Sequence, residues 1–306
     1  MNNQSRAVRF DRYGGPEVLH VESIPTPVPA EGEVVVEVRA AGINPGEIGI
    51  RSGAMRDRYP ATFPSGQGSD LAGVVVALGA GVTEFREGDE VLGYSWQRSS
   101  QATHVAVPVH QLIIRPVELS WEQAGGLYVV AATAYAAIRA VDPQPGETVA
   151  VSAAAGGVGT LVVQLLRRRG VEVIGIASAA NDEWLRERGV VPVHYGDDLA
   201  EQLADRKIDA FIDLFGPQYV RLAVDLGIPR DRIETIIAFA LAQELGVKAE
   251  GSMLASTREV LTEMAGLVAD GSLELLVAAT YPLDKVADAF TELEKRHTRG
   301  KIVLIP

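Results

Sequence analysis

Hydrophobic and polar positions in the first part of the chain follow the short runs typical of β-strands. Residues 34–40 and 73–79 are rich in β-branched side chains and are bounded by glycine or acidic turns. Further short runs follow at 88–93, 103–107 and 112–116. Many short strands with glycine and proline between them predict a barrel-like β domain.

The pattern changes at Ser120, where Ser120 and Gln123 form the capping box of a helix predicted over residues 121–141. From there strands and helices alternate, which predicts a parallel sheet covered by helices on both faces. The predicted strands are 148–152, 171–177, 191–194, 210–214 and 233–237, with a further candidate at 247–250. The predicted helices are 157–169, 182–188, 199–204, 218–226, 257–269 and 283–295. A last strand at 301–305 is expected to return to the first domain.

Composition fits a globular chain of two domains. The sequence has 306 residues, of which 47% are hydrophobic and 22% charged. It has no cysteine, which excludes a disulfide framework, a thiol nucleophile, an iron–sulfur cluster and cysteine-based zinc sites. A net charge of -12 argues against a nucleic-acid partner. Neither a signal peptide nor a membrane span is indicated, so we expect a cytoplasmic protein with no membrane partner.

The most informative segment is a glycine-rich turn between a strand and a helix. Ala153, Gly156 and Gly159 have the Rossmann dinucleotide spacing with the first glycine replaced. Backbone amides at a helix N-terminus bind a pyrophosphate when no side chain intervenes, and Gly156 and Gly157 meet that condition. The alternative is a tight turn that binds no ligand.

The end of the following strand favours NADPH over NADH. An acidic residue that would bind the ribose hydroxyls of NAD is missing at Ala177 and Ser178. A carboxylate there would repel a 2′-phosphate, whereas small polar groups tolerate it. Asp182 comes too late and is expected to start the next helix, and Arg186 is only a distant candidate for pairing the phosphate.

Taken together, the motifs resemble the medium-chain dehydrogenase/reductase superfamily, and most closely its zinc-free quinone oxidoreductase branch. The resemblance covers nearly the full length, in order, and rests on residues 41–45, 50–53, 68–75, 85–91, 132–135, 153–159 and 300–304. It implies an α/β protein with a GroES-like β-barrel domain (1–120 and 271–306) and a Rossmann doubly wound parallel-sheet domain that binds NADP (121–270). Cofactor and substrate would then lie in the cleft between these domains.

The resemblance also implies that the zinc ligands of related enzymes are missing from this chain. In zinc-containing relatives a catalytic cysteine ligand stands where this chain has Asn44, and a histidine ligand is replaced near Ser69. The five histidines are scattered without ligand spacing, so the sequence predicts an enzyme without zinc.

Site residues follow from the same motifs. Asn44 and Thr133 would lie near the nicotinamide and its ribose and are the catalytic candidates. The pyrophosphate would bind at Ala155, Gly156, Gly157, Val158 and Gly159. Ser178 and Tyr195 would contact the adenosine 2′-phosphate, and Phe239 would line the nicotinamide side.

Structural alternatives exist for several of these residues. Asn44 could form only a turn with Pro45, Thr133 could bond its own helix backbone, Tyr195 could end a strand, and Phe239 could be a core aromatic.

One position departs from the family pattern. Where relatives carry a tyrosine before the segment at 50–53, this chain has Gly49. The usual aromatic substrate contact and proton donor are therefore in doubt. Tyr59, Tyr94 and Tyr128 are substitutes by residue type only.

The sequence thus favours an NADPH-dependent quinone oxidoreductase that works without metal on a small-molecule acceptor. Reduction of enoyl or alkenal double bonds on the same scaffold is the alternative, with Asn44, a tyrosine or the cofactor ribose as donor to the enolate. A non-catalytic NADPH-binding protein is a third possibility. Because residues 246–251 form a candidate edge strand and relatives are commonly dimers, we expect a homodimer.

Overall fold

A computed structural model describes residues 4–306, and the contacts divide the chain into two compact units. Unit 1 comprises Met1–Val129 with Thr257–Pro306, and unit 2 comprises Val130–Ser256.

Unit 1 is built on strands that pair antiparallel, except for its last two strands, which are parallel to each other. Its strands are β1 (Gln4–Phe10), β2 (His20–Pro25), β3 (Glu33–Gly42), β4 (Ser65–Gly66), β5 (Asp70–Leu78), β6 (Glu90–Tyr94), β7 (His104–Pro108), β8 (Leu112–Ile114), β14 (Val277–Pro282) and β15 (Lys301–Ile305). Its helices are α1 (Pro45–Ser52), α2 (Trp121–Gly126), α9 (Arg258–Ala269) and α10 (Val286–Glu294). The larger sheet has the order β14-β15-β3-β5-β6-β8 with β7 paired to β3, and the smaller has the order β2-β1-β4.

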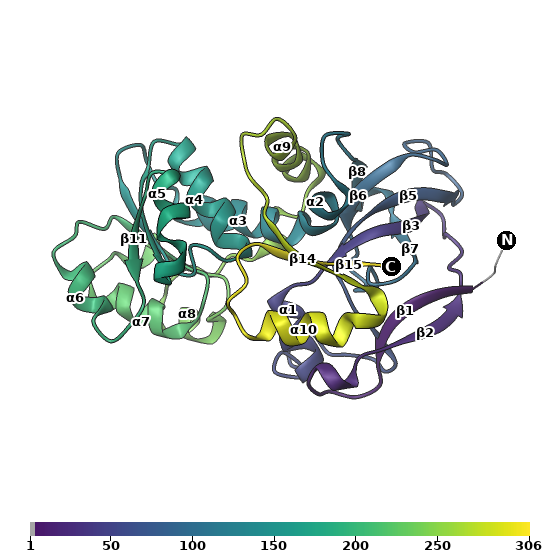
Figure 1. Ribbon diagram of the computed structural model, residues 1–306, viewed down its shortest axis with the longest axis horizontal. Helices are drawn as coiled ribbons and strands as arrows, with labels where there is room; N and C mark the ends of the chain where they lie inside the picture. Colours follow the sequence, from purple (N-terminus) through teal and green to yellow (C-terminus); the bar gives the residue numbers. More distant parts are fainter. Residues whose placement is uncertain (1–3) are drawn as a thin grey trace. The chain divides into compact units, whose positions relative to one another are not determined.

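The last strand confirms one expectation. β15 pairs antiparallel with β3 through Val303 and Gly42, so the C-terminal strand joins the larger sheet of unit 1 (Figure 1). Valines that alternate along β3, namely Val34, Val36 and Val38, are buried in the core of this sheet. The strand forms because its β-branched residues pack on one face of the pleated surface.

Unit 2 is a parallel sheet with helices. Its strands are β9 (Thr148–Val151), β10 (Glu172–Ala177), β11 (Val190–His194), β12 (Ala210–Asp213) and β13 (Ile233–Thr235). Its helices are α3 (Tyr128–Val141, which begins in unit 1), α4 (Gly157–Arg168), α5 (Asp182–Glu187), α6 (Leu199–Ala204), α7 (Pro217–Asp225) and α8 (Phe239–Leu245). The strand order is β11-β10-β9-β12-β13, and every neighbouring pair is parallel.

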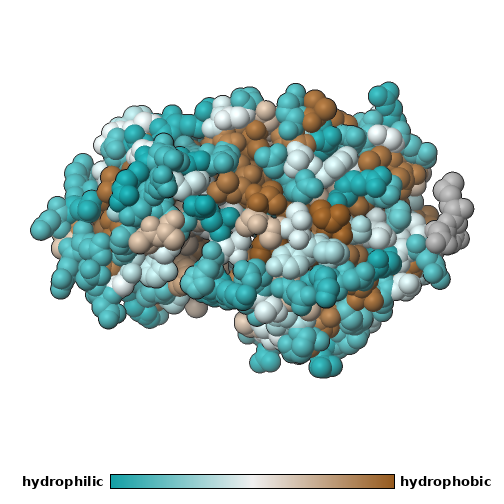
Figure 2. Space-filling view, in the orientation of Figure 1, coloured by the Kyte–Doolittle hydropathy of each residue, from teal (hydrophilic) through white to brown (hydrophobic). Residues whose placement is uncertain are grey.

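Helices bury both faces of this sheet. Ile174 and Ile176 of β10 belong to a core shared with α6, α7 and α8. On the opposite face, a Cβ at Gly175 would lie 3.2 Å from the Leu185 side chain of α5. The outer surface over α5 and α6 is mostly hydrophilic (Figure 2), in keeping with the high net charge.

Two predicted elements differ in the structure. The single helix expected over 121–141 is divided at Leu127 into α2 and α3. A Cβ at Gly125 would overlap the Ala40 carbonyl, so α2 packs closely on β3, and the Asp70 carboxylate accepts the Val129 amide in the first turn of α3. The strand expected at 247–250 is only an isolated bridge between Glu234 and Lys248.

The boundaries of the units also differ from the sequence-based ones at 120/121 and 270/271. Contacts assign α2 and α9 to unit 1, because α2 packs on β3 and β5 and α9 packs on β8. A helical pattern in the sequence carries no information about which sheet the helix covers.

Candidate functional site

The glycine-rich turn of unit 2 joins β9 to α4. Gly156 is the N-cap of α4, and no side chain caps this helix end. A Cβ on Gly159 would overlap the Ala153 carbonyl and the Ala154 backbone, which explains why a glycine is needed there. A Cβ on Gly156 would lie 3.3 Å from the Ala153 oxygen and 4.0 Å from the Ala153 Cβ. The N-terminus of α4 is thus left without a side-chain cap, an arrangement that suits an anion.

Ser178 and Tyr195 follow the ends of two neighbouring parallel strands. The preceding residues, Ala177 and His194, are partners in the register of β10 and β11. The Ser178 hydroxyl accepts a hydrogen bond from the Asn181 amide at 2.9 Å, and the Tyr195 side chain is exposed. The structure therefore brings both predicted residues to the same edge of the sheet.

Beside Ser178 and Tyr195 lies a group of ion pairs that the sequence did not predict. Asp182 begins α5, as expected, and also contacts His194 at 2.9 Å and Arg186 at 2.8 Å. The hydrogen bond from His194, more than the contacts with Arg186, lowers the pKa of the Asp182 carboxyl. The distant phosphate candidate Arg186 is thus already paired with a carboxylate. Residues twelve positions apart carry no local sequence signal of such a contact.

Asp213 joins the ends of three strands at the edge that carries the glycine-rich turn. Its carboxylate accepts hydrogen bonds from the Ser152 and Thr235 hydroxyls, each at 2.7 Å, and from the amides of Phe215 and Gly216. Asp213 is fully buried, so these donors supply the polar contacts that an ionised carboxylate needs. This network fixes the backbone where the parallel strands end.

The remaining unit 2 candidates lie on helices. Thr133 is buried in α3. Phe239 is the first residue of α8 and is half-buried.

In unit 1 Asn44 lies in a buried polar cluster, defined here as Asn44, Glu47, Asp70 and Lys301. Asn44 caps α1 and precedes Pro45 at the first helical position, so it is more than a turn. The Lys301 ammonium donates to Asn44 Oδ1 at 2.5 Å, to Asp70 at 3.0 Å and to the Ile43 carbonyl. Because an ammonium only donates, this contact fixes which way the Asn44 amide points.

The other side of the Asn44 amide faces carboxylates. Nδ2 donates to Asp70 at 3.2 Å and to Glu47 at 3.4 Å. With both hydrogens committed, Asn44 keeps one acceptor lone pair and has no donor left for a substrate oxygen. The sequence-based idea that Asn44 donates to an enolate is therefore not supported by the hydrogen bonds of the side chain.

Glu47 is the carboxyl of the polar cluster that packs against Asn44, Asp70 and Lys301 and has a raised pKa. Burial, and next the Asp70 carboxylate, raise its pKa to about 7, while Lys301 and Asn44 lower it. Glu47 also accepts from the Ser69 amide at 3.2 Å and from Gln101 at 3.0 Å. The cluster accordingly changes charge near neutral pH.

Gly42 makes room for the cluster, since a Cβ there would lie 2.6 Å from Asp70 Oδ2. A Cβ at Gly126 would be in ordinary contact with the Lys301 stem, at 3.5 Å. Met55 covers Gly49, where a Cβ would be 2.7 Å from the sulfur. The space at Gly49 is therefore occupied by a methionine from the turn that follows α1.

No group of three or more His, Cys, Asp or Glu residues within 4–306 is arranged to hold a metal ion. None of the helices in the same range combines the length and apolar character needed to cross a bilayer.

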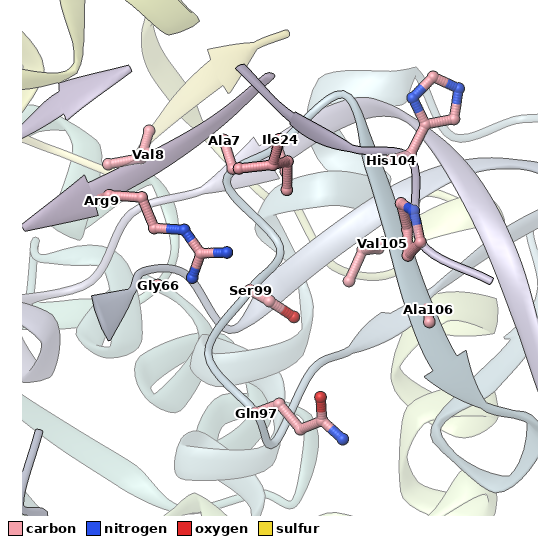
Figure 3. Close-up of a pocket in the computed structure, with 12 residues that line it drawn as sticks. Ala7, Val8, Arg9, Ile24, Gly66, Gln97, Ser99, His104, Val105 and Ala106 are labelled. Carbon is pink, nitrogen blue, oxygen red and sulfur yellow. The ribbon is translucent and has the colours of Figure 1, made fainter. Parts of the chain in front are cut away.

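A cavity of about 160 Å³ in unit 1 lies between β1, β2 and β7. The Arg9 guanidinium points toward the loop of Gln97 and Ser99, whereas the His104 ring turns away (Figure 3). The residues that line it include none of the site residues predicted from the sequence.

Comparisons with known proteins agree with this architecture. Residues 30–113 match the family model of the alcohol dehydrogenase GroES-like domain, and residues 188–304 match that of the zinc-binding dehydrogenases. Human quinone oxidoreductase is 30% identical over 98% of this chain and 97% of its own length.

Two solved structures are similar over the full chain. The quinone oxidoreductase of Escherichia coli, complexed with NADPH, has 28% identity and a TM-score of 0.88, over 98% of this chain and 100% of that one. The enzyme of Coxiella burnetii has 27% identity and a TM-score of 0.90, over 99% of each chain.

The fold and the glycine-rich turn thus define a medium-chain dehydrogenase/reductase, with a GroES-like domain and a Rossmann domain as predicted. Within this superfamily the chain belongs to the quinone oxidoreductase branch, and it is an oxidoreductase.

Proposed function

We propose that this protein reduces a quinone-type acceptor with NADPH and without a metal ion. The observation that carries the proposal is the uncapped, unobstructed N-terminus of α4 in a chain similar to quinone oxidoreductases, one of them solved with NADPH. Ala155, Gly156, Gly157, Val158 and Gly159 would hold the pyrophosphate.

Further contacts to the cofactor follow from the strand ends and helices. Ser178 and Tyr195 would receive the adenosine 2′-phosphate, and Thr133 and Phe239 would contact the nicotinamide half. The free acceptor lone pair of Asn44 suits a hydroxyl donor such as that of a ribose.

Bound NADPH supplies a hydride, and this hydride with one proton converts a quinone into a hydroquinone and leaves NADP⁺. Because the product ring becomes aromatic, the acceptor needs little acid catalysis, and water can supply the proton. The protein's part is to bind, orient and exclude water. The polar cluster fits this role, because its side-chain amide donors already bind carboxylates and are not needed to protonate the acceptor.

Steady-state assays with NADPH test the proposal. We expect 1,4-naphthoquinone to be reduced with a higher kcat/KM than 2-cyclohexenone, and NADPH to be used in preference to NADH. Faster turnover of the enone would favour the double-bond reductase. Binding of NADPH without oxidation by any acceptor would favour a non-catalytic role.

We also propose a homodimer that pairs through residues 246–251, the candidate edge segment in which Lys248 bridges to Glu234 of β13. A monomeric mass at micromolar concentration would contradict this. The cytoplasmic location expected from the sequence stays a prediction, and fractionation of the host cells tests it.

A further inference from the structure

Three aromatic side chains of unit 1 form a cluster, defined here as Tyr94, Trp96 and Tyr128. The rings of Tyr94 and Tyr128 stack, with centroids 4.1 Å apart and planes at 15°. The Trp96 ring lies 6.0 Å from Tyr94 at 58°. The cluster thus joins the end of β6 to the start of α3.

This aromatic cluster adjoins the polar cluster that holds Asn44. Tyr94 lies directly opposite Asp70 in the antiparallel pair of β6 and β5, so the two side chains project from the same face of the sheet. Asp70 binds the Asn44 amide and also accepts the amide of Val129, next to Tyr128. Strand pairing at Tyr94 and the backbone hydrogen bond next to Tyr128 therefore place both residues near the Asn44 neighbourhood.

Trp96 is exposed yet held in place. Tyr94 and Tyr128 are 3% and 6% exposed, whereas Trp96 is 46% exposed. The Trp96 indole hydrogen-bonds the Tyr94 hydroxyl, and the Trp96 amide donates to Gln111 at 3.2 Å. An indole ring held at the surface in this way offers a face on which a planar ligand ring can stack.

We propose that Trp96 stacks against the ring of a planar, electron-poor acceptor and so selects quinones of extended ring area. This inference rests on the proposed function and names its substrate class more closely. The face of an indole is rich in electrons, so it attracts an electron-poor quinone more than the electron-rich hydroquinone. The same contact therefore favours binding of the oxidised substrate over retention of the reduced product.

The test compares Trp96→Leu with Trp121→Leu. Trp121 is a matched control because it lies in the same unit, on α2, and packs under the Arg115 guanidinium instead of in the aromatic cluster. An aromatic contact contributes about 1 kcal/mol, or roughly fivefold in affinity. We expect Trp96→Leu to raise the KM for 1,4-naphthoquinone about fivefold or more, with kcat within about twofold of wild type.

Three further results are expected. Trp96→Phe, which keeps a ring, recovers most of the KM. Trp121→Leu leaves it within about twofold. The KM for 2-cyclohexenone, which has no planar aromatic ring, changes little in any variant. Equal effects of Trp96→Leu and Trp121→Leu, or an equal rise for both acceptors, would overturn the stacking role.

The assay separates this inference from the proposed function. Wild-type protein that turns over no quinone would contradict the function. Calorimetric binding of 1,4-naphthoquinone to wild type and Trp96→Leu would then still decide the stacking role, since binding unchanged by the substitution would refute it.

Discussion

Glu234 gives unit 2 a pH-dependent stability that can be measured. It lies on β13, at the edge of the parallel sheet, and is fully buried. Oε1 accepts from the Glu250 amide at 2.6 Å, and Oε2 has no hydrogen-bond partner among the described residues. Burial is the main cause that raises the pKa of Glu234 to about 8; the charges of Glu250 and Asp213 add to it, and Lys248 and the backbone hydrogen bond oppose it.

The direction and size of the effect follow from that pKa. The ordinary pKa of the carboxyl is 4.5, against about 8 in the fold. The folded chain therefore holds the proton more tightly, and the free energy of unfolding falls as the pH rises from about 4.5 to about 8. At about 1.4 kcal/mol per pKa unit, the loss is at most about 5 kcal/mol.

Glu234→Gln isolates this effect. The amide keeps an acceptor for Glu250 and resembles the protonated carboxyl, so variant and wild type should have similar stability near pH 5. At pH 9 the variant should be more stable by a few kcal/mol, up to about 5. Urea unfolding between pH 5 and pH 9 measures the difference.

Glu244→Gln, an exposed position on α8, is the control and should follow wild type within about 0.5 kcal/mol at every pH. A difference between Glu234→Gln and wild type that does not grow with pH would refute the reasoning.

Three other perturbations, the first with a matched control variant, test the site. Lys301→Met leaves the buried Asp70 carboxylate without its cation, so the free energy of unfolding should fall by about 3–5 kcal/mol. We also expect kcat to fall, because Asn44 loses the contact that fixes its orientation. The control is Arg51→Met, which removes an equally buried cation that pairs with Glu294. It should lower stability and leave the kcat of the folded fraction unchanged. Equal kcat values in the two variants would count against a positioning role for Lys301. Gly156→Val places a side chain in the space above the first turn of α4. Calorimetry should then show NADPH binding at least about tenfold more weakly, with the far-UV circular dichroism unchanged. Full affinity for NADPH would contradict the pyrophosphate site. Dialysis against a metal chelator should leave quinone reduction unaltered, and activity restored only by added zinc would disprove the metal-free mechanism.

Local patterns in the sequence were enough for most of the secondary structure and for the glycine-rich turn between β9 and α4. The glycines at 156–159 follow a buried strand and open a helix, and these conditions are set by residues close together in the chain. Ser120 and Gln123 form their capping box for the same reason. The alternation of strands and helices also predicted that the last strand returns to the first domain, where β15 pairs with β3.

Only the tertiary structure decided the chemistry around Asn44. Lys301 is separated from Asn44 by 257 positions and from Asp70 by 231, so no local pattern announces their contact. The same holds for the division between α2 and α3, which depends on the approach of Gly125 to β3, and for the burial of Glu234 at a sheet edge. The physical reason is that a buried charge needs a partner, and this partner can come from any segment that the fold brings near it. Such contacts therefore depend on the fold of the whole chain and not on neighbouring residues in the sequence.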